Sequence, residues 1–284
     1  MGSRLLVTLL LVATLLAGCT KPRPDSNGAA SASLTIKGSD TLVQLAQAWA
    51  QGFMKTHPEI SVTVTGGGSN TGIAALLNKG TDIANASRPM KPEEFDKAKA
   101  NGIDVKEVVV ARDALSIVVN PKNPVAELTM QQLADIYSGK ITNWREVGGP
   151  DTNIVASGRD SSSGTYVFFQ EHVLHKGPYG RGVLSQISNS QIASSVAEDV
   201  GGVGYIGLGY IDESLKDLKI KANDSAPGVA GNLENVKNGT YPLARPLFEY
   251  FVGEPKGAAE VWKDWILGPE GQKLVENLGF ITAK

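Results

Sequence analysis

The sequence predicts an α/β protein of two lobes, each with helices packed around a mixed, mostly parallel sheet. Strand-like and helix-like segments alternate along the chain, glycine-rich turns join them, and the same strand-to-helix unit occurs in both halves. Apolar residues make up 42% of the 284 residues, which suffices for a core in each lobe and argues against disorder. We therefore expect two lobes that face each other across a cleft.

The first half contains strand-to-helix units whose turns are rich in glycine and hydroxyl residues. Alternating apolar residues indicate strands, and apolar residues that recur every three or four positions indicate helices. In chain order we expect strand 34–36, helix 42–53, strand 60–64, helix 73–80, strand 82–86, helix 92–100 and strands 105–110 and 115–119.

The second half repeats the alternation and carries clear helix boundaries. Thr129 with Gln132 three residues later is a capping box, and Gly139 is a typical helix stop. Pro269 suits the first turn of the last helix. In chain order we expect helix 128–139, strand 153–156, helix 166–174, helix 191–198, strand 203–206, an extended run at 243–252 and two closing helices.

These elements divide the folded part of the chain into two lobes. We assign residues 34–115 together with 246–284 to lobe I, and residues 116–245 to lobe II. The chain passes between the lobes in the extended runs 115–120 and 243–251, where we expect the hinge.

The beginning of the chain is typical of an exported lipoprotein. Residues 1–18 carry a base at Arg4 and then an apolar run shorter than the roughly 20 residues that a membrane-spanning helix needs, which indicates a signal peptide. Cys19 follows two small residues, a pattern that resembles the bacterial lipobox, in which the cysteine sulfur is diacylated. The alternative is a buried or accidental thiol. Residues 19–33 are rich in Pro, Ser, Ala and Gly and predict a flexible tether.

Charge and cysteine content exclude several classes of protein. Loss of residues 1–18 would remove one base from 27 and none of the 29 acids, which leaves a net charge of −3. The chain therefore has no basic field for nucleic acid, and its single cysteine excludes a disulfide framework.

Three turns place glycines and hydroxyl residues where a strand ends and a helix begins: 39–41, 68–71 and 161–165. The first N–H groups of a helix have no partner within the helix and carry the positive end of its dipole, so they attract an oxyanion. Each turn alone is also explained by good helix capping. Three of them in one chain favour an anion site.

Two charged residues sharpen this expectation. Arg159 lies four residues before Ser163, close enough for its guanidinium to bind the same oxyanion, although pairing with Asp160 on a solvated loop is the alternative. An ionised Asp82 could accept the proton of hydrogen phosphate and so reject sulfate, which carries no proton at neutral pH. Asp82 could equally be a surface acid at a strand edge.

The chain resembles phosphate-binding proteins of the PstS type over nearly all of residues 34–280, through GSDTL, the glycine-rich 66–72, TDIANASRP and R-x-x-x-S-G-T. The resemblance implies a two-lobed type II periplasmic binding protein fold and nominates as phosphate ligands Thr41, Leu42 through its N–H, Ser69, Asp82, Arg159, Ser163, Gly164 and Thr165. Additional contacts are expected from Ser39, Ser87 and Arg88. Some relatives carry an acid two residues after the arginine; here that position is Ser161, and whether Asp160 replaces the acid is open.

The resemblance implies high-affinity extracytoplasmic binding of inorganic phosphate and its delivery to the permease subunits of an ABC importer. The protein would be a monomer without cofactor or metal, held at the outer side of a bacterial membrane by the lipid on Cys19. The alternatives are a binding protein for sulfate, molybdate or tungstate, and a lipoprotein that senses phosphate or adheres to surfaces.

Enzymatic function has little support in the sequence. Neither G-x-S-x-G nor H-E-x-x-H occurs, and Ile73 follows the glycine run where a nucleotide P-loop needs lysine. His172 and His175 lie three residues apart on one expected helix, but no further His or Cys cluster accompanies them, so a solvated helix face is expected instead of a zinc site.

Overall fold

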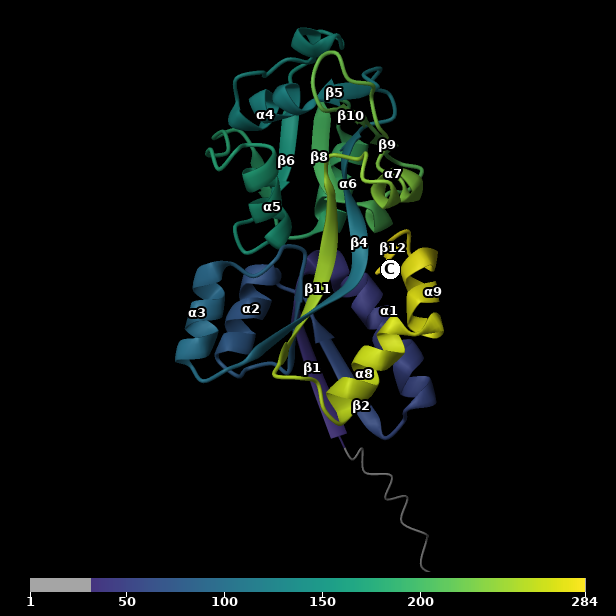
Figure 1. Cartoon of the computed structure of the whole chain (residues 1–284). Coiled ribbons are helices and arrows are strands. Elements are labelled where there is room, and N and C mark those ends of the chain that lie inside the picture. Colours follow the sequence, from purple (N-terminus) through teal and green to yellow (C-terminus); the bar gives the residue numbers. More distant parts are fainter. Residues whose placement is uncertain (1–31, 284) are drawn as a thin grey trace, which may run out of the picture.

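The computed structural model describes residues 32–283 (Figure 1). The expected signal peptide, Cys19 and most of the expected tether lie outside these residues. The first strand begins at Ala32, which pairs with Ile60, so the expected tether extends two residues too far.

One mixed sheet runs through the molecule. Its strand order is β2-β1-β3-β11-β4-β8-β6-β7, and β9 and β12 pair with β4 beside this path. The bounds are β1 Ala32–Gly38, β2 Ile60–Thr65, β3 Ile83–Ala86, β4 Val105–Val119, β6 Val155–Arg159, β7 Leu184–Gln186, β8 Gly202–Gly207, β9 Lys216–Asp217, β11 Ala244–Val252 and β12 Ile281–Thr282. Two further strands, β5 Glu127–Thr129 and β10 Lys219–Lys221, form a small separate sheet.

The antiparallel strands β4 and β11 join the two expected sheets into one. Strands β1, β2 and β3 are parallel, as are β6, β7 and β8, whereas β11 is antiparallel to β3 and β4, and β4 is antiparallel to β8. The two expected strands 105–110 and 115–119 are a single strand, β4, because the residues between them continue the pairing with β11.

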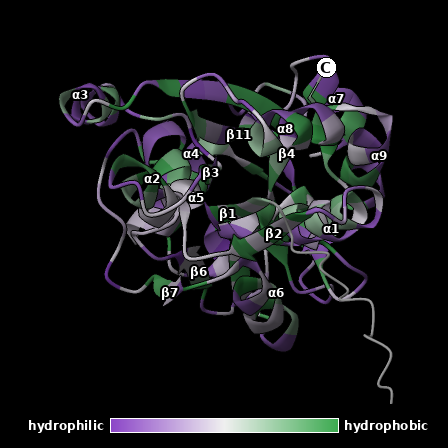
Figure 2. Cartoon of the chain, turned by 90° about the horizontal axis from the view of Figure 1, so that it is seen from below, coloured by the Kyte–Doolittle hydropathy of each residue, from purple (hydrophilic) through white to green (hydrophobic). Residues whose placement is uncertain are grey.

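Helices cover both faces of the lower part of the sheet. Figures 1 and 2 show β1 between α2 on one side and α1, α8 and α9 on the other. Apolar residues of α1, α8 and α9 form one buried cluster with β1 and β2, and those of α2 and α3 form another with β3 and β11. We call these elements the lower group; its helices are α1 Asp40–Thr56, α2 Ser69–Leu77, α3 Pro92–Ala100, α8 Ala258–Leu267 and α9 Pro269–Asn277.

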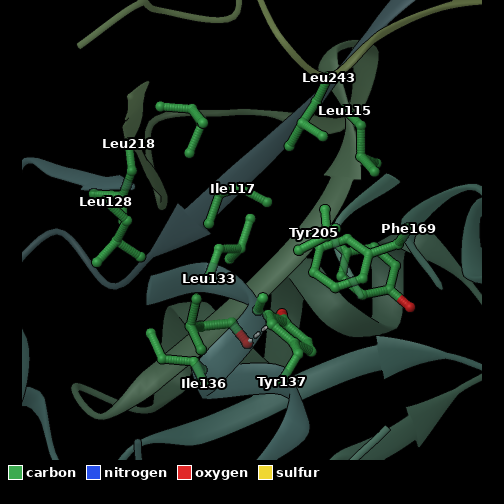
Figure 3. Packing of buried hydrophobic residues seen from close by; sticks show 14 of the residues in the cluster. Leu115, Ile117, Leu128, Leu133, Ile136, Tyr137, Phe169, Tyr205, Leu218 and Leu243 are labelled. Carbon is green, nitrogen blue, oxygen red and sulfur yellow. Dashed lines mark hydrogen bonds between the residues drawn. The ribbon is translucent and has the colours of Figure 1, made fainter. Parts of the chain in front are cut away.

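The upper group consists of β5–β10 and its helices, α4 Met130–Ser138, α5 Gly164–His172, α6 Asn189–Glu198 and α7 Leu233–Lys237, with 3-10 turns η1 Trp144–Val147 and η2 Leu208–Tyr210. Figure 3 shows its core, in which Ile117 of β4 lies beside Leu133 of α4 and Tyr205 lies against Phe169. The rings of Phe169 and Tyr205 stack with centroids 4.2 Å apart. This packing fixes α5 on the sheet.

Local signals in the sequence set several boundaries correctly. The capping box of Thr129 and Gln132 is present, Gly139 ends α4 in the left-handed region at φ 82°, and Pro269 occupies the first turn of α9. Helices α2 and α5 begin earlier than expected, at Ser69 and Gly164, so they start within the hydroxyl turns themselves.

Strands β4 and β11 run through both groups (Figure 1). The expected lobe boundaries, 115/116 and 245/246, fall within these strands and, like the hinge, stay predictions. The pairing of β4 with β11 shifts register between Leu247 and Phe248. Within residues 32–283, no helix combines the length and apolar character that crossing a bilayer requires.

Candidate anion-binding site

Four hydroxyl side chains from separate turns meet where the two groups touch. Thr41 Oγ1 lies 3.0 Å from Thr165 Oγ1, Ser87 Oγ lies 3.3 Å from the same atom, and Ser69 Oγ lies 3.3 Å from Ser87 Oγ. All four residues are at most 1% exposed. We call Thr41, Ser69, Ser87 and Thr165 the hydroxyl cluster.

The topology explains why these residues converge. Strands β1, β2 and β3 are parallel, so their carboxyl ends share one edge of the sheet, where α1, α2 and the turn after β3 begin. Helix α5 brings its first turn to the same place from the upper group. The cluster therefore lies at the N-termini of three helices, whose free N–H groups and dipoles favour an oxyanion.

Two serines occupy the N-cap positions of these helices. Ser163 caps α5, since its Oγ accepts hydrogen bonds from Thr165 N at 3.1 Å and Tyr166 N at 3.4 Å. Ser39 precedes α1 but makes no capping bond, and its buried Oγ has no hydrogen-bond partner within residues 32–283. Its donor is thus free for another group.

Glycine at two positions lets the groups approach closely. A Cβ on Gly164 would lie 2.3 Å from Ser69 Oγ and 2.9 Å from Ser87 Oγ. Gly68 has φ +93°, and a Cβ there would lie 2.4 Å from Ser162 O. Asn70 also donates its N–H to Ser162 O at 3.0 Å, so backbone contacts across the groups accompany the cluster.

Arg159 is buried beside the cluster, and several partners orient it. Its N–H donates to Tyr205 Oη at 2.9 Å, and its Nη2 donates to Ile187 O at 2.8 Å. Burial raises the pKa of Tyr205 to about 12, so this hydroxyl stays protonated at neutral pH.

The nearest carboxylate to Arg159 comes from the other group. Asp40 Oδ2 lies 3.2 Å from Arg159 Nη1, whereas Asp160 Oδ2 lies 4.0 Å from Nη2. Asp160 uses its Oδ1 to accept a hydrogen bond from Ser162 N at 2.8 Å. The carboxylate that orients the arginine is therefore principally Asp40, which the sequence did not indicate.

Arg245 of β11 is a second cation at the cluster, and it too was missed. Its Nη1 donates to Thr165 Oγ1 at 3.0 Å and to Ser87 O at 3.3 Å, while Nε and Nη2 donate to Asp113 Oδ2 at 3.1 and 2.8 Å. Its guanidinium carbon lies 5.3 Å from the centre of the Phe168 ring. The available signal was an arginine within a run of apolar strand residues.

Arg88 is buried, but its hydrogen-bond partners are structural. Its guanidinium donates to Glu94 at 2.6 and 2.8 Å and to Asn70 Oδ1 at 2.6 and 3.1 Å. Although burial opposes ionisation, the hydrogen bond and charge of Arg88 lower the pKa of Glu94. Arg88 thus ties α2 to α3, and the expected ligand contact stays a prediction.

Asp82 lies at the wrong end of its strand for the expected role. It precedes β3, whereas Ser87 follows it, and five residues of extended chain span about 16 Å. Asp82 is exposed, and its Oδ2 accepts hydrogen bonds from Thr35 N and Thr35 Oγ1, both at 2.8 Å. The structure therefore contradicts a contact between Asp82 and an anion at the cluster.

Leu42 is fully buried at the start of α1, and its N–H donates to Ser39 O at 3.2 Å.

His172 and His175 do not share a helix, because α5 ends at His172 and His175 has φ 50°. Among residues 32–283, no group of three or more His, Cys, Asp or Glu side chains has the arrangement of a metal site.

The three buried arginines near the cluster are each matched by a carboxylate: Arg88 by Glu94, Arg159 by Asp40 and Arg245 by Asp113. These pairs contribute no net formal charge. An anion here would be held largely by oriented N–H and hydroxyl dipoles, with the guanidinium groups adding donors.

The chain is similar to known proteins over most of its length. Residues 24–270 match the model of the PBP superfamily domain. Protein SphX of Synechococcus elongatus is 37% identical over 88% of this chain and 77% of its own length. The phosphate-binding protein PstS of Pseudomonas aeruginosa is 31% identical over 92% of this chain and 86% of its own length.

Solved structures show the same fold. A putative phosphate ABC transporter substrate-binding protein with bound phosphate from Clostridium perfringens is 33% identical, with a TM-score of 0.80 over 89% of this chain and all of the other. An ABC-type phosphate transport receptor from Vibrio cholerae is 30% identical, with a TM-score of 0.72 over 88% of this chain and 99% of the other. The chain therefore belongs to the PBP superfamily and, within it, to the family of the phosphate-binding protein PstS.

Proposed function

We propose that this protein binds one inorganic phosphate ion outside the cytoplasm and delivers it to the permease subunits of an ABC importer. The observation that carries the proposal is the hydroxyl cluster, buried where three helix N-termini from both groups meet. The family relationship supports phosphate as the ligand, since relatives of similar length are phosphate-binding proteins.

The ligand set follows from the turns around the cluster. We assign Thr41, Ser69 and the N–H of Leu42 from the lower group, and Arg159, Ser163, Gly164 and Thr165 from the upper group. Ser87 belongs to this set by its position in the cluster, Ser39 offers its free hydroxyl, and Asp82 is left out. Charge-assisted hydrogen bonds contribute about 1.5 to 3 kcal/mol each, and micromolar affinity needs about 8 kcal/mol.

Release and capture require the two groups to separate. Ligands from both groups face the same point, so binding would shift the protein toward a closed form in which the ion is desolvated. The two strands that run through both groups, β4 and β11, are the natural place for the hinge. The closed monomer would then dock on the importer.

The partners of the hydroxyl cluster support a role in binding an anion and not in catalysis. The partners of Thr41, Ser69, Ser87 and Thr165 hydroxyls within residues 32–283 are one another, a backbone N–H and the Arg245 guanidinium. A nucleophilic hydroxyl needs an adjacent general base, and a guanidinium cannot serve as one.

Titration calorimetry with phosphate, sulfate and molybdate tests the proposal. We expect one phosphate per chain, and Thr165→Val to weaken binding by about tenfold or more through loss of a ligand hydroxyl. Thr56→Val is the matched control, because Thr56 lies at the other end of α1 and its Oγ1 donates to Phe53 O at 3.0 Å. Absence of phosphate binding would refute the proposal.

A binding protein for another tetrahedral oxyanion is the second candidate. The placement of Asp82 favours keeping it, because the acid expected to reject sulfate is not at the cluster. Sulfate or molybdate binding tighter than phosphate in the same titration would establish this alternative.

We also propose that the protein is lipid-anchored through Cys19, on the strength of its position after an export signal. Mass spectrometry of protein extracted from membranes should show a diacylated Cys19 at the mature N-terminus. Cys19→Ser should release the protein from the membrane, and unchanged membrane association would contradict the anchor.

A further inference from the structure

Asp40 belongs to the lower group, yet its carboxylate is bound by the upper group. Its Oδ2 accepts hydrogen bonds from Arg159 Nη1 at 3.2 Å, from Asn189 N at 2.9 Å and from Asn189 Nδ2 at 2.6 Å. Its carbonyl oxygen accepts a further bond from Tyr210 Oη at 2.7 Å. The first residue of α1 is thus held by three residues of the opposite group.

Contacts within the upper group also hold the residues that bind Asp40. The Arg159 side chain is 1% exposed, and Ile187 O holds its Nη2 at 2.8 Å. Asn189 is fully buried, and its Oδ1 accepts a hydrogen bond from Gly207 N of β8 at 3.2 Å. A rigid receptor loses little conformational entropy when it takes up a carboxylate.

The same contacts show what Arg159 lacks within its own group. Asp160 stands next to it in sequence but lies 4.0 Å away, and Ser162 N occupies its Oδ1. Charge-assisted hydrogen bonds and ion pairs weaken steeply with distance and exposure to water. Arg159 therefore has its closest carboxylate only when the two groups are together.

We propose that Asp40 is a positioning residue that couples closure of the lobes to the orientation of Arg159. This inference rests on the proposed function, and it assigns Asp40 no contact with phosphate. Closure brings Asp40 onto Arg159 and Asn189, which fixes the guanidinium beside the hydroxyl cluster. Opening removes this carboxylate, so Arg159 keeps its hydrogen bond to Ile187 O but loses its closest carboxylate at the moment when the ion must leave.

Asp40 should affect the dissociation rate constant of phosphate and not slow its association. The carboxylate is negative and lies next to Thr41, so it does not attract an anion that approaches the open form. Its stabilising contacts join the two groups, so opening would break them. Loss of the charge should therefore speed dissociation and leave association unchanged or faster.

The variant Asp40→Asn tests whether this carboxylate stabilises the closed form. Asp82→Asn is the matched control, because Asp82 is an acid whose hydrogen bonds are to Thr35 in its own group. Small-angle X-ray scattering of the phosphate-free protein should show a larger radius of gyration for Asp40→Asn than for the wild type. Stopped-flow measurements should show phosphate dissociation faster by about tenfold or more, the loss expected for one charge-assisted bond. The control should match the wild type in both measurements.

A second variant guards against misfolding of the first. Asn189→Asp places a carboxylate against Asp40, while an acid at the first position of α6 suits the helix dipole. It should also open the phosphate-free protein and speed dissociation. If both variants fold and match the wild type in radius of gyration and dissociation rate, the proposal is wrong. A wild-type protein that binds no phosphate would refute the proposed function instead, and scattering would still test Asp40.

Discussion

Arg245 and Asp113 face each other on neighbouring antiparallel strands and form an ion pair of 2.8 Å that is buried, with side chains 1% and 0% exposed. The pair lies on β4 and β11, and Arg245 also donates to Thr165 of the hydroxyl cluster at 3.0 Å. The strands that join the two groups are thus bonded directly to the candidate ligand set.

Arg245→Met should destabilise the protein by about 3 to 5 kcal/mol, because removal of one partner leaves the other charge buried and unpaired. Burial already raises the pKa of Asp113, against the opposing charge of Arg245. Urea unfolding at neutral pH measures the loss. Arg112→Met, at an exposed position of the same strand, should change stability little.

The double variant Arg245→Met with Asp113→Asn removes the buried charge but keeps an acceptor for Leu208 N, which donates to Asp113 Oδ1 at 3.0 Å. It should recover most of the lost stability. A double variant as unstable as Arg245→Met alone would contradict the unpaired-charge explanation.

Gly164→Ala should block closure while leaving the fold intact. A Cβ would lie 2.3 Å from Ser69 Oγ, a separation that forces the two groups apart, whereas alanine suits the first position of α5. We expect phosphate affinity to fall by about tenfold or more, which is at least about 1.4 kcal/mol. Titration calorimetry measures this loss. Gly182→Ala, where a Cβ meets nothing within 4 Å, is the control and should bind like the wild type.

Asp82→Asn should leave the ratio of phosphate to sulfate affinity unchanged, because Asp82 lies at the opposite end of β3 from Ser87. Stability should fall by less than about 1 kcal/mol, since asparagine can still accept a hydrogen bond from Thr35. Competition calorimetry with both anions measures the ratio. A smaller ratio of phosphate to sulfate affinity in Asp82→Asn would indicate that the Asp82 carboxylate does accept the proton of hydrogen phosphate.

Glu249 of β11 should make the protein less stable as the pH rises. Burial raises its pKa from the ordinary 4.5 to about 8, although its Oε2 accepts a hydrogen bond from Trp262 Nε1 at 2.9 Å, which acts in the opposite direction. Between these two pKa values the folded protein holds a proton that the unfolded chain has released. The free energy of unfolding should therefore fall between about pH 4.5 and about pH 8. The fall should amount to a few kcal/mol, since each unit of pKa difference corresponds to about 1.4 kcal/mol.

Glu249→Gln should remove this part of the pH dependence and be more stable than the wild type above about pH 8. Urea unfolding from pH 5 to pH 9 compares the two proteins. Glu254→Gln is the control, because the Glu254 side chain is 66% exposed beside Lys106. Parallel pH profiles for wild type and Glu249→Gln would show that Glu249 is ionised in the folded protein.

The failed expectation for Asp82 has an instructive cause. The sequence identified the strand that ends at the cluster, but Asp82 precedes that strand, and helices begin after the carboxyl end of a parallel strand, where the dipoles of their N-termini lie together. Residues that follow a strand, such as Ser87, reach that edge, and residues that precede it do not. Strand direction was available in the sequence and would have excluded Asp82.

The sequence by itself determined the features that depend on neighbouring residues. Helix α3 has the predicted bounds, Thr129 and Gln132 cap α4, and the turns that supply Thr41, Ser69 and Thr165 were recognised, because capping and turn formation act over a few residues.

Only the tertiary structure decided which charges meet. Asp40 and Arg159 are 119 residues apart in the chain, and Asp113 and Arg245 are 132 apart. No local pattern encodes such pairs, since they depend on the register of β4 with β11 and on the packing of α1 against the upper group. The sequence therefore indicates candidate residues for an oxyanion site, and the fold decides which carboxylates pair with the arginines beside them.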